Sequence, residues 1–183
     1  IDNKNVMSLK ILADESILVD RCLADDREAQ KLLYEKYKHV FYTIALRITG
    51  NNEDAKDALQ DGFVNIFQSM SNYSGKSSLY YWMKTIIIRA SIKKIERNIQ
   101  WRQIEDYEES FLFTWDDELT GVMLEKVIAG LEKGYRTVFL LIEVEGYKHK
   151  EVAQILNISE GTSKSQLYHA KKQLQRILKS HRP

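Results

Sequence analysis

The chain contains one proline, Pro183, and only eight glycines among its 183 residues, so few positions interrupt a helix. It also contains one cysteine, Cys22, which excludes an internal disulfide and a cysteine-rich zinc site. Because no His–Asp arrangement lies near Cys22 in the sequence, we expect an incidental thiol rather than a nucleophile. Strand-like alternation is nearly absent as well, and the sequence therefore predicts an all-α protein.

Long apolar runs are also missing. No stretch approaches the ~18–20 residues that a membrane-spanning helix needs. Lys10, Asp14 and Glu15 interrupt residues 7–19, which excludes the core of a secretory signal. With 44% hydrophobic and 29% charged residues, the composition is that of a folded protein. We therefore expect a cytoplasmic protein without direct membrane insertion.

The net charge of +1 conceals a segregation of charge along the sequence. Residues 98–120 are acidic, with Arg102 as their only basic residue. From Lys148 onward the chain is basic, with Glu151 and Glu160 as its only acidic residues. An acidic middle, a basic end and a mixed front half favour separate partners over one uniform surface.

Apolar residues recur at steps of three and four in several segments, which is typical of helices with one buried face. Residues 29–48, 53–70 and 79–97 form a first group of long helices, and four further helices follow the acidic segment, the last of them a longer one that ends near Leu178. We therefore predict two helical domains joined by an acidic linker. The first domain, a bundle of three to four helices, spans residues 25–97, the linker 98–120 and the second domain 121–183. Residues 1–24 form an N-terminal extension, for which an extra helix is one possibility.

The clearest motif lies between Tyr147 and Leu178 and has the properties of a helix-turn-helix. Ala153 in the first helix is small enough for a close crossing, and Asn157-Ile158-Ser159 predicts a tight turn that ends in a helix cap. The outward positions of the second helix are expected to be Thr162, Lys164, Ser165, Gln166, Tyr168, His169 and Lys172. The alternative is a plain helical hairpin with a solvated basic face. Turn, crossing residue and basic face together favour DNA binding.

Two motif blocks resemble one protein family. Residues 147–156 and 160–171 resemble the C-terminal promoter-reading domain of bacterial sigma factors, although many response regulators carry a similar motif. Residues 57–63 (DALQDGF) and 73–83 (YSGKSSLYYWM) resemble the N-terminal domain of the same family. The blocks occur in the family's order, and the linker is too short for a middle domain. The sequence thus resembles the extracytoplasmic-function (ECF) group of the sigma-70 family.

This resemblance implies a non-enzymatic subunit that gives RNA polymerase its promoter specificity, promotes promoter opening and so directs transcription initiation. The surface that docks on the clamp helices of core polymerase would include Asp57, Gln60, Asp61 and Phe63. Asp54, Asp57 and Asp61 lie at helical spacing, so one face combines acid with apolar surface and suits a basic partner. A metal site is the alternative there, but carboxylates without a nearby histidine more often form an interface. No metal and no cofactor is expected.

The resemblance also implies two DNA contacts. For the minus-ten element, a flipped base would enter the loop that contains Lys76, Ser77 and Ser78. The aromatic run of Tyr80, Tyr81 and Trp82 would stack on unpaired bases or, in part, pack in the core. A basic stripe along the following helix would meet phosphates. The minus-ten residues are Lys76, Ser77, Ser78, Tyr80, Tyr81, Trp82, Arg89, Lys93 and Arg97. The residues for the duplex minus-thirty-five element are Lys148, Lys150, Thr162, Lys164, Ser165, Gln166, Tyr168, His169, Lys171 and Lys172, with Gln166 and His169 reading bases.

The sequence departs from the family pattern at three of these positions. Arg89 stands where the family usually carries Asn, and Gln166 and His169 stand where basic residues are frequent. The promoter sequence therefore cannot be taken from relatives. The acidic linker resembles the family's segment that threads toward the RNA exit path, where negative charge mimics nucleic acid. An anti-sigma factor, often membrane-tethered, is implied as a further partner.

Two functions of other classes stay open. A stand-alone regulator that binds duplex DNA as a dimer would show an operator dyad and no dependence on polymerase. A helical interaction protein without a DNA role would show no salt-sensitive binding of nucleic acid. An enzyme is least expected, because no set of nucleophile, base and oxyanion donors can be named. The four histidines, His39, His149, His169 and His181, form no ligand pattern.

Overall fold

The computed structural model describes residues 15–96 and 121–180. The chain divides into two compact units, and the division falls between Lys94 and Ile95. Every regular element within the described residues is a helix, so the predicted all-α fold is confirmed. None of these helices is both long and apolar enough to cross a membrane.

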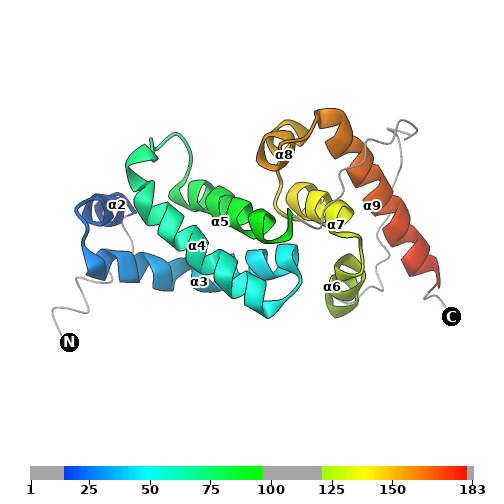
Figure 1. Ribbon diagram of the computed structural model, residues 1–183, viewed down its shortest axis with the longest axis horizontal. Helices are drawn as coiled ribbons and strands as arrows, with labels where there is room; N and C mark the ends of the chain where they lie inside the picture. Colours follow the sequence, from blue (N-terminus) through cyan, green and yellow to red (C-terminus); the bar gives the residue numbers. More distant parts are fainter. Residues whose placement is uncertain (1–14, 97–120, 181–183) are drawn as a thin grey trace. The chain divides into compact units, whose positions relative to one another are not determined.

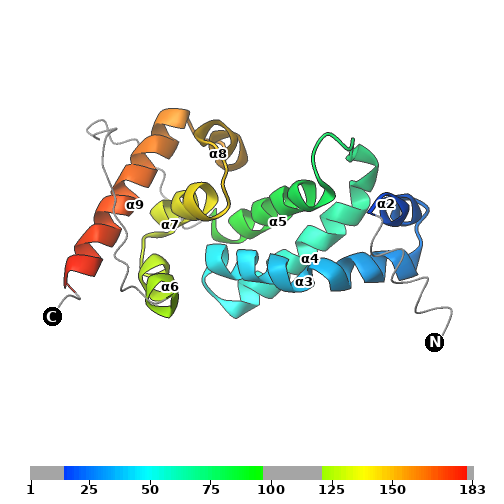
Figure 2. The same ribbon diagram turned by 180° about the vertical axis from the view of Figure 1, so that it is seen from behind.

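The first unit is a helical bundle (Figure 1). Its core consists of aliphatic and aromatic side chains. Its elements are α2 (Glu15–Leu23), α3 (Arg27–Thr49), α4 (Asn52–Gln68), the 3-10 helix η1 (Met70–Asn72) and α5 (Leu79–Ile95). Helices α3 and α4 pack along each other, as the two opposite views show (Figure 1, Figure 2). Phe41, Ile66 and Ile87 are fully or almost fully buried between the helices.

The helix ends in this unit follow from local chemistry. The Asp26 carboxylate accepts hydrogen bonds from the backbone N–H groups of Glu28 and Ala29 and so begins α3. Gly50 ends α3 in the left-handed region, at φ 81°, which is open to glycine without strain. The Asn51 side chain then accepts from the N–H of Asp54 and begins α4.

Helix α2 lies within the segment that was predicted as an N-terminal extension. Leu18 and Cys22 are buried, and the helix packs on α3. The hydroxyl of Tyr37 in α3 donates to the Glu15 carboxylate at 2.5 Å. Burial raises the pKa of Cys22 to about 11, so the thiol stays protonated at neutral pH and is a poor nucleophile. Residues 15–23 are therefore an integral helix of the first unit.

Helices α4 and α5 approach each other closely at Gly62. A Cβ atom at this position would lie 2.5 Å from Cδ1 of Ile87. The glycine is buried in the interior of α4, where its helix propensity alone costs about 1 kcal/mol relative to alanine. The close crossing explains why glycine stands there nevertheless.

We expect Gly62→Ala to destabilise the first unit by up to about 2 kcal/mol, because overpacking of the crossing, at about 1–3 kcal/mol, exceeds the gain of about 1 kcal/mol in helix propensity. Shortening the neighbour by Ile87→Val removes Cδ1, so the double variant should recover part of the loss. Urea unfolding followed by circular dichroism measures the double-mutant cycle. If the two substitutions changed the free energy of unfolding additively, the close crossing would be contradicted.

The second unit is built around the basic C-terminal helix. Its elements are α6 (Gly121–Ala129), α7 (Lys133–Phe139), a π-helical turn η3 (Leu140–Val144), α8 (His149–Leu156) and α9 (Glu160–Ser180). Helix α9 packs against α6, α7 and α8. Phe139, Leu141 and Leu174 are buried in its core, and the buried Arg136 donates from Nη1 to the carbonyl oxygen of Ala129 at 2.9 Å.

Candidate nucleic-acid interface

The two helices of the predicted helix-turn-helix are α8 and α9. Asn157 ends α8 in the left-handed region, at φ 52°, and Ser159 begins α9 by accepting the backbone N–H of Thr162 at 2.9 Å. Ala153 is buried, and Nδ1 of His149 forms a hydrogen bond with the Ser163 hydroxyl at 2.9 Å across the two helices. The predicted turn, small crossing residue and cap are confirmed.

Three of the positions expected to face outward on α9 do not. Thr162, Ser165 and Gln166 are buried, Gln166 with 1% of its surface exposed, so the predicted orientation is wrong for them. The hydroxyl of Thr162 bonds that of Ser159, and the Ser165 hydroxyl donates to the carbonyl oxygen of Thr162. Local hydrogen bonds thus satisfy these small polar groups in a buried setting. The burial of Gln166 follows from its place on one helical stripe with Thr162 and the fully buried Ala170.

The other predicted residues of this unit remain accessible. Lys148, Lys150 and Lys172 are exposed, and Lys164, Tyr168 and His169 are half-buried. Lys171 differs from expectation, because its ammonium forms an ion pair with Glu143 of η3 at 2.7 Å. The charge of Lys171 therefore holds α9 to the neighbouring turn in this structure.

An aromatic cluster surrounds His169. Its ring stacks on Tyr135 of α7, with 5.9 Å between centroids, and meets the Tyr168 ring edge-on at 5.0 Å. The Lys172 ammonium lies 5.6 Å from the centroid of Tyr168. Burial, and then the neighbouring Lys172, lowers the pKa of His169 below its ordinary value, so the imidazole is neutral at physiological pH. Its Nε2 is buried without a hydrogen-bond partner within the described residues, so the neutral ring does not present both nitrogens to a base edge.

The stability of the second unit should fall as the pH is lowered through about 6.5, the ordinary histidine pKa. Burial lowers the pKa of both His149 and His169, so the unfolded chain takes up these protons at a higher pH than the folded unit does. Stability is then complete above the unfolded pKa and is lost as the pH falls toward the folded one. Hydrogen exchange of α9, corrected for intrinsic rates, measures this. The double variant His149→Asn, His169→Asn should flatten the dependence, and an unchanged slope would contradict it.

The acidic face of α4 is exposed but already has an internal partner. The carboxylates of Asp57 and Asp61 and the Gln60 side chain are exposed, as predicted for a docking surface. Lys94 of α5 forms an ion pair with Asp61 at 2.8 Å and a longer one with Asp57 at 3.7 Å. The hydrogen bond to Asp61 is the main cause that raises the pKa of Lys94.

Phe63 is not part of this exposed face. Only 3% of its surface is exposed, and its ring packs against Tyr34, Phe41 and Phe67 at centroid distances of 4.8, 6.0 and 6.0 Å. Phe63 is therefore buried in this structure, and its contact with a partner stays a prediction. The ring supports the acidic face from within the core.

The loop between η1 and α5 is held by its own side chains. The Tyr73 hydroxyl donates to the carbonyl oxygen of Ser77 at 2.8 Å, and the Ser78 hydroxyl accepts the N–H of Tyr81 at the start of α5. Gly75 has a φ of 71°, which lets the loop reverse direction. Lys76, Ser77 and Ser78 are exposed on it, as expected for residues that receive a base.

The aromatic run beside this loop divides between core and surface. Tyr80 stacks on Phe41 at 5.6 Å and lies 6.0 Å from Tyr37, so it packs with the core. Trp82 is half-buried and contacts the loop through Tyr73, with 5.4 Å between ring centroids. The buried Lys84, which sequence reasoning missed, places its ammonium 5.4 Å from the Tyr81 centroid. Tyr73 was missed too, although its place at the loop start could have indicated it.

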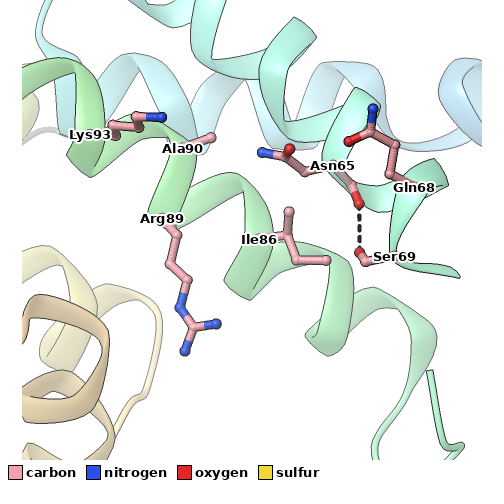
Figure 3. A pocket seen from close by; sticks show the side chains of 7 residues that line it. All are labelled: Asn65, Gln68, Ser69, Ile86, Arg89, Ala90 and Lys93. Carbon is pink, nitrogen blue, oxygen red and sulfur yellow. Dashed lines mark hydrogen bonds between the residues drawn. The ribbon is translucent and has the colours of Figure 1, made fainter. Parts of the chain in front are cut away.

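The basic stripe on α5 borders an open groove of about 370 Å³ between α4 and α5. Arg89 and Lys93 are exposed and line it (Figure 3). Arg97, the third residue of the predicted stripe, lies outside the described residues, as does the acidic linker.

Comparison with known families decides between the classes of function left open by the sequence. The family model described as Sigma-70 region 2 matches residues 33–110, and the one described as Sigma-70, region 4 matches residues 121–174. Together these matches span well over half of the chain. The chain belongs to the sigma-70 family.

Individual relatives agree with this family. RNA polymerase sigma-H factor of Pseudomonas aeruginosa is 24% identical over 181 residues, which cover 88% of this chain and 92% of the relative. The ECF RNA polymerase sigma-E factor of Haemophilus influenzae is 23% identical over 180 residues, covering 90% and 94%. The resemblance to the ECF group of sigma-70 factors is thereby confirmed.

A solved structure shares the fold. The sigma factor RpoE of Bartonella quintana, solved in complex with the anti-sigma factor NepR, matches with a TM-score of 0.54 and 19% identity, covering 83% of this chain and 98% of that one. In sigma-70 terms, the first unit carries region 2 and the helix-turn-helix belongs to region 4. The loop, α5 and the acidic face of α4 thus lie in region 2, and α8 and α9 lie in region 4.

Proposed function

We propose that the chain is an ECF-type sigma factor that binds core RNA polymerase and directs promoter recognition, promoter opening and transcription initiation. The observation that carries this is the presence of two sigma-70 regions in one chain and in family order. A stand-alone regulator needs only the helix-turn-helix and has no use for region 2. Sigma factors are transcription initiation factors, and we assign the chain no enzymatic activity of its own.

Region 4 would bind the upstream duplex element. The exposed Lys148, Lys150 and Lys172 suit phosphate contacts, which give affinity without sequence preference. Lys164 and the cluster of Tyr168 and His169 lie on the accessible part of α9 and would contact base edges. Thr162, Ser165 and Gln166 would contribute by shaping the helix, because they are buried.

Region 2 would bind the downstream element as it opens. Tyr81 and Trp82 offer half-buried rings next to the exposed loop of Lys76, Ser77 and Ser78, and base stacking on aromatic rings tolerates any base. The loop residues would hold an unpaired base and its backbone. The stripe of Arg89 and Lys93 would neutralise phosphates beside them.

The two remaining partners are core polymerase and an anti-sigma factor. Asp57, Gln60 and Asp61 would dock on a basic surface of core polymerase in exchange for Lys94. We also propose an anti-sigma factor as a partner, which is supported by the complex of the Bartonella relative. We propose that the sigma factor acts in the bacterial cytoplasm. The proposed domains are residues 25–97 and 121–183 with 98–120 between them, and α2 extends the first one to Glu15.

Co-elution with core polymerase tests the docking step. The full chain mixed with purified core polymerase should move to the polymerase peak in gel filtration. Elution as a separate dimer that binds a palindromic duplex without polymerase would favour the stand-alone regulator and contradict the proposal.

A further inference from the structure

An ion pair between η3 and α9 has no role in the DNA contacts proposed for region 4. The Lys171 ammonium of α9 lies 2.7 Å from Oε1 of Glu143 in η3. The two side chains are 23% and 30% exposed, so water and salt screen this pair less than a fully exposed one. The sequence predicts that Lys171 contacts the upstream duplex, but Glu143 neutralises its charge within the second unit.

The π-helical turn holds Glu143 in place beside α9. Leu140 and Leu141 at the start of the turn are buried, and Glu143 follows them at an exposed position. The backbone N–H of Glu145 donates to the carbonyl oxygen of Leu140 at 2.9 Å and closes the wide turn. Single turns of this kind are rare and often occur at functional sites. The carboxylate is therefore positioned by a packed backbone rather than by a loose loop.

Lys171 lies on the side of α9 that we expect to approach DNA. Lys164, Tyr168 and Lys171 follow one another at steps of four and three, so they form one stripe along the helix. Lys164 and Tyr168 are accessible and are among the residues proposed to contact base edges. The Glu143 carboxylate is thus held at the border of the proposed DNA surface. There it competes with a phosphate for the same ammonium group.

We propose that Glu143 limits the sequence-independent binding of the free chain to duplex DNA by occupying Lys171. A lysine that neutralises a phosphate releases a counterion and adds about 0.9 to the salt slope of binding. A lysine that a carboxylate already neutralises releases none, and the carboxylate itself repels phosphate. The inference rests on the proposed function and deepens it, because it assigns region 4 a contact that acts against DNA binding.

The restraint acts chiefly on DNA of random sequence, where phosphate contacts supply essentially all of the affinity. A genome offers about 10⁶–10⁹ such competing sites, which can hold the free chain before it meets polymerase. On a promoter, base contacts add to the affinity, so one phosphate contact matters less. The alternative is a purely structural pair that holds α9 to η3 without its ammonium reaching DNA. Breaking such a pair would lower stability and leave the salt slope of DNA binding unchanged.

The test uses the full chain and fluorescent duplexes of random sequence in anisotropy titrations at about 50 to 200 mM salt. Glu143→Gln should bind more tightly than the wild type at the lowest salt. Its affinity should then fall roughly threefold further across this range, because its salt slope is steeper by about 0.9. Glu143→Gln combined with Lys171→Gln should bind as the wild type does. The matched control is Glu132→Gln, the same loss of charge at an exposed residue before α7, which should also bind as the wild type does.

Three outcomes would overturn the proposal. They are an unchanged affinity and salt slope in Glu143→Gln, tighter binding that persists in the double variant, and an equal gain in Glu132→Gln, which would indicate net charge alone. Circular dichroism shows whether each variant is folded. If Glu143→Gln is unfolded, Glu143→Lys combined with Lys171→Glu restores an ion pair and should bind as the wild type does, and tighter binding by this swap would contradict the proposal. Loss of co-elution of the wild type with core polymerase would instead overturn the proposed function, so the two failures are distinguishable.

Discussion

Asp61→Lys should lower the affinity of the chain for core polymerase by roughly 100-fold, because like charges placed together at an interface cost several kcal/mol. The Asp61 carboxylate is exposed and belongs to the acidic face of α4. The substitution also places two ammonium groups next to each other, because Lys94 lies 2.8 Å from that carboxylate in the wild type. Fluorescence anisotropy of the labelled chain against core polymerase measures the affinity.

A charge swap separates docking from folding. Asp61→Lys combined with Lys94→Asp restores an internal ion pair and should recover any lost stability, but it should leave polymerase binding weak. Asp20→Lys makes the same change of net charge at an exposed position of α2 and serves as the matched control. Recovery of polymerase binding by the swap would show that the pair matters only for the fold. If Asp20→Lys lowered the affinity for polymerase equally, the effect would result from net charge and not from the position of Asp61.

Trp82→Ala should impair promoter opening more than any other single substitution beside the loop. Stacking of an unpaired base on an aromatic ring contributes about 1–3 kcal/mol, which corresponds to roughly five- to 150-fold in the stability of the open complex. The ring contacts Tyr73 at the start of the loop and is half-buried, so it can pack on the loop and on a base together. Permanganate reactivity of unpaired thymines in holoenzyme–promoter complexes measures opening.

A premelted template distinguishes capture of the open strand from melting itself. If Trp82 stacks on an unpaired base, the defect of Trp82→Ala persists on DNA that already carries a bubble. Val40→Ala, at an exposed apolar position of α3, is the control that should open promoters normally. Full rescue on the bubble template would place Trp82 outside the contact with single-stranded DNA.

The fold could be predicted well wherever local chemistry decides it. Gly50 and Asn51 separate two helices because a left-handed stop and a side-chain cap are properties of those residues alone. The turn of Asn157 to Ser159 was predictable for the same reason. The extra helix α2 was left open, since a short amphipathic segment becomes stable only through packing on its neighbours.

The candidate sites were harder to predict because polarity is a poor guide to exposure. Ser165 and Gln166 are polar yet buried, so a pattern that assigns apolar residues to the inside places them wrongly. Helix α9 packs against more than one helix, which widens its buried arc beyond a single stripe. Phe63, an apolar residue within the motif expected to dock on polymerase, is buried in the core beneath the acidic face.

Ion pairs between distant segments were beyond sequence reasoning. Lys171 pairs with Glu143, and Lys94 pairs with Asp61, in each case across two helical elements. Nothing in the spacing of these residues indicates the partner. The cations on α5 that line the groove, Arg89 and Lys93, lie on another side of the helix than Lys94.

Run-off transcription from genomic fragments tests the central claim most directly. Core polymerase supplied with the full chain should produce discrete transcripts that core polymerase alone does not produce. Their start sites should share an element at a fixed distance upstream, as two DNA contacts on one chain require. The absence of new transcripts from a mixture in which both proteins are active would contradict a role as a sigma factor.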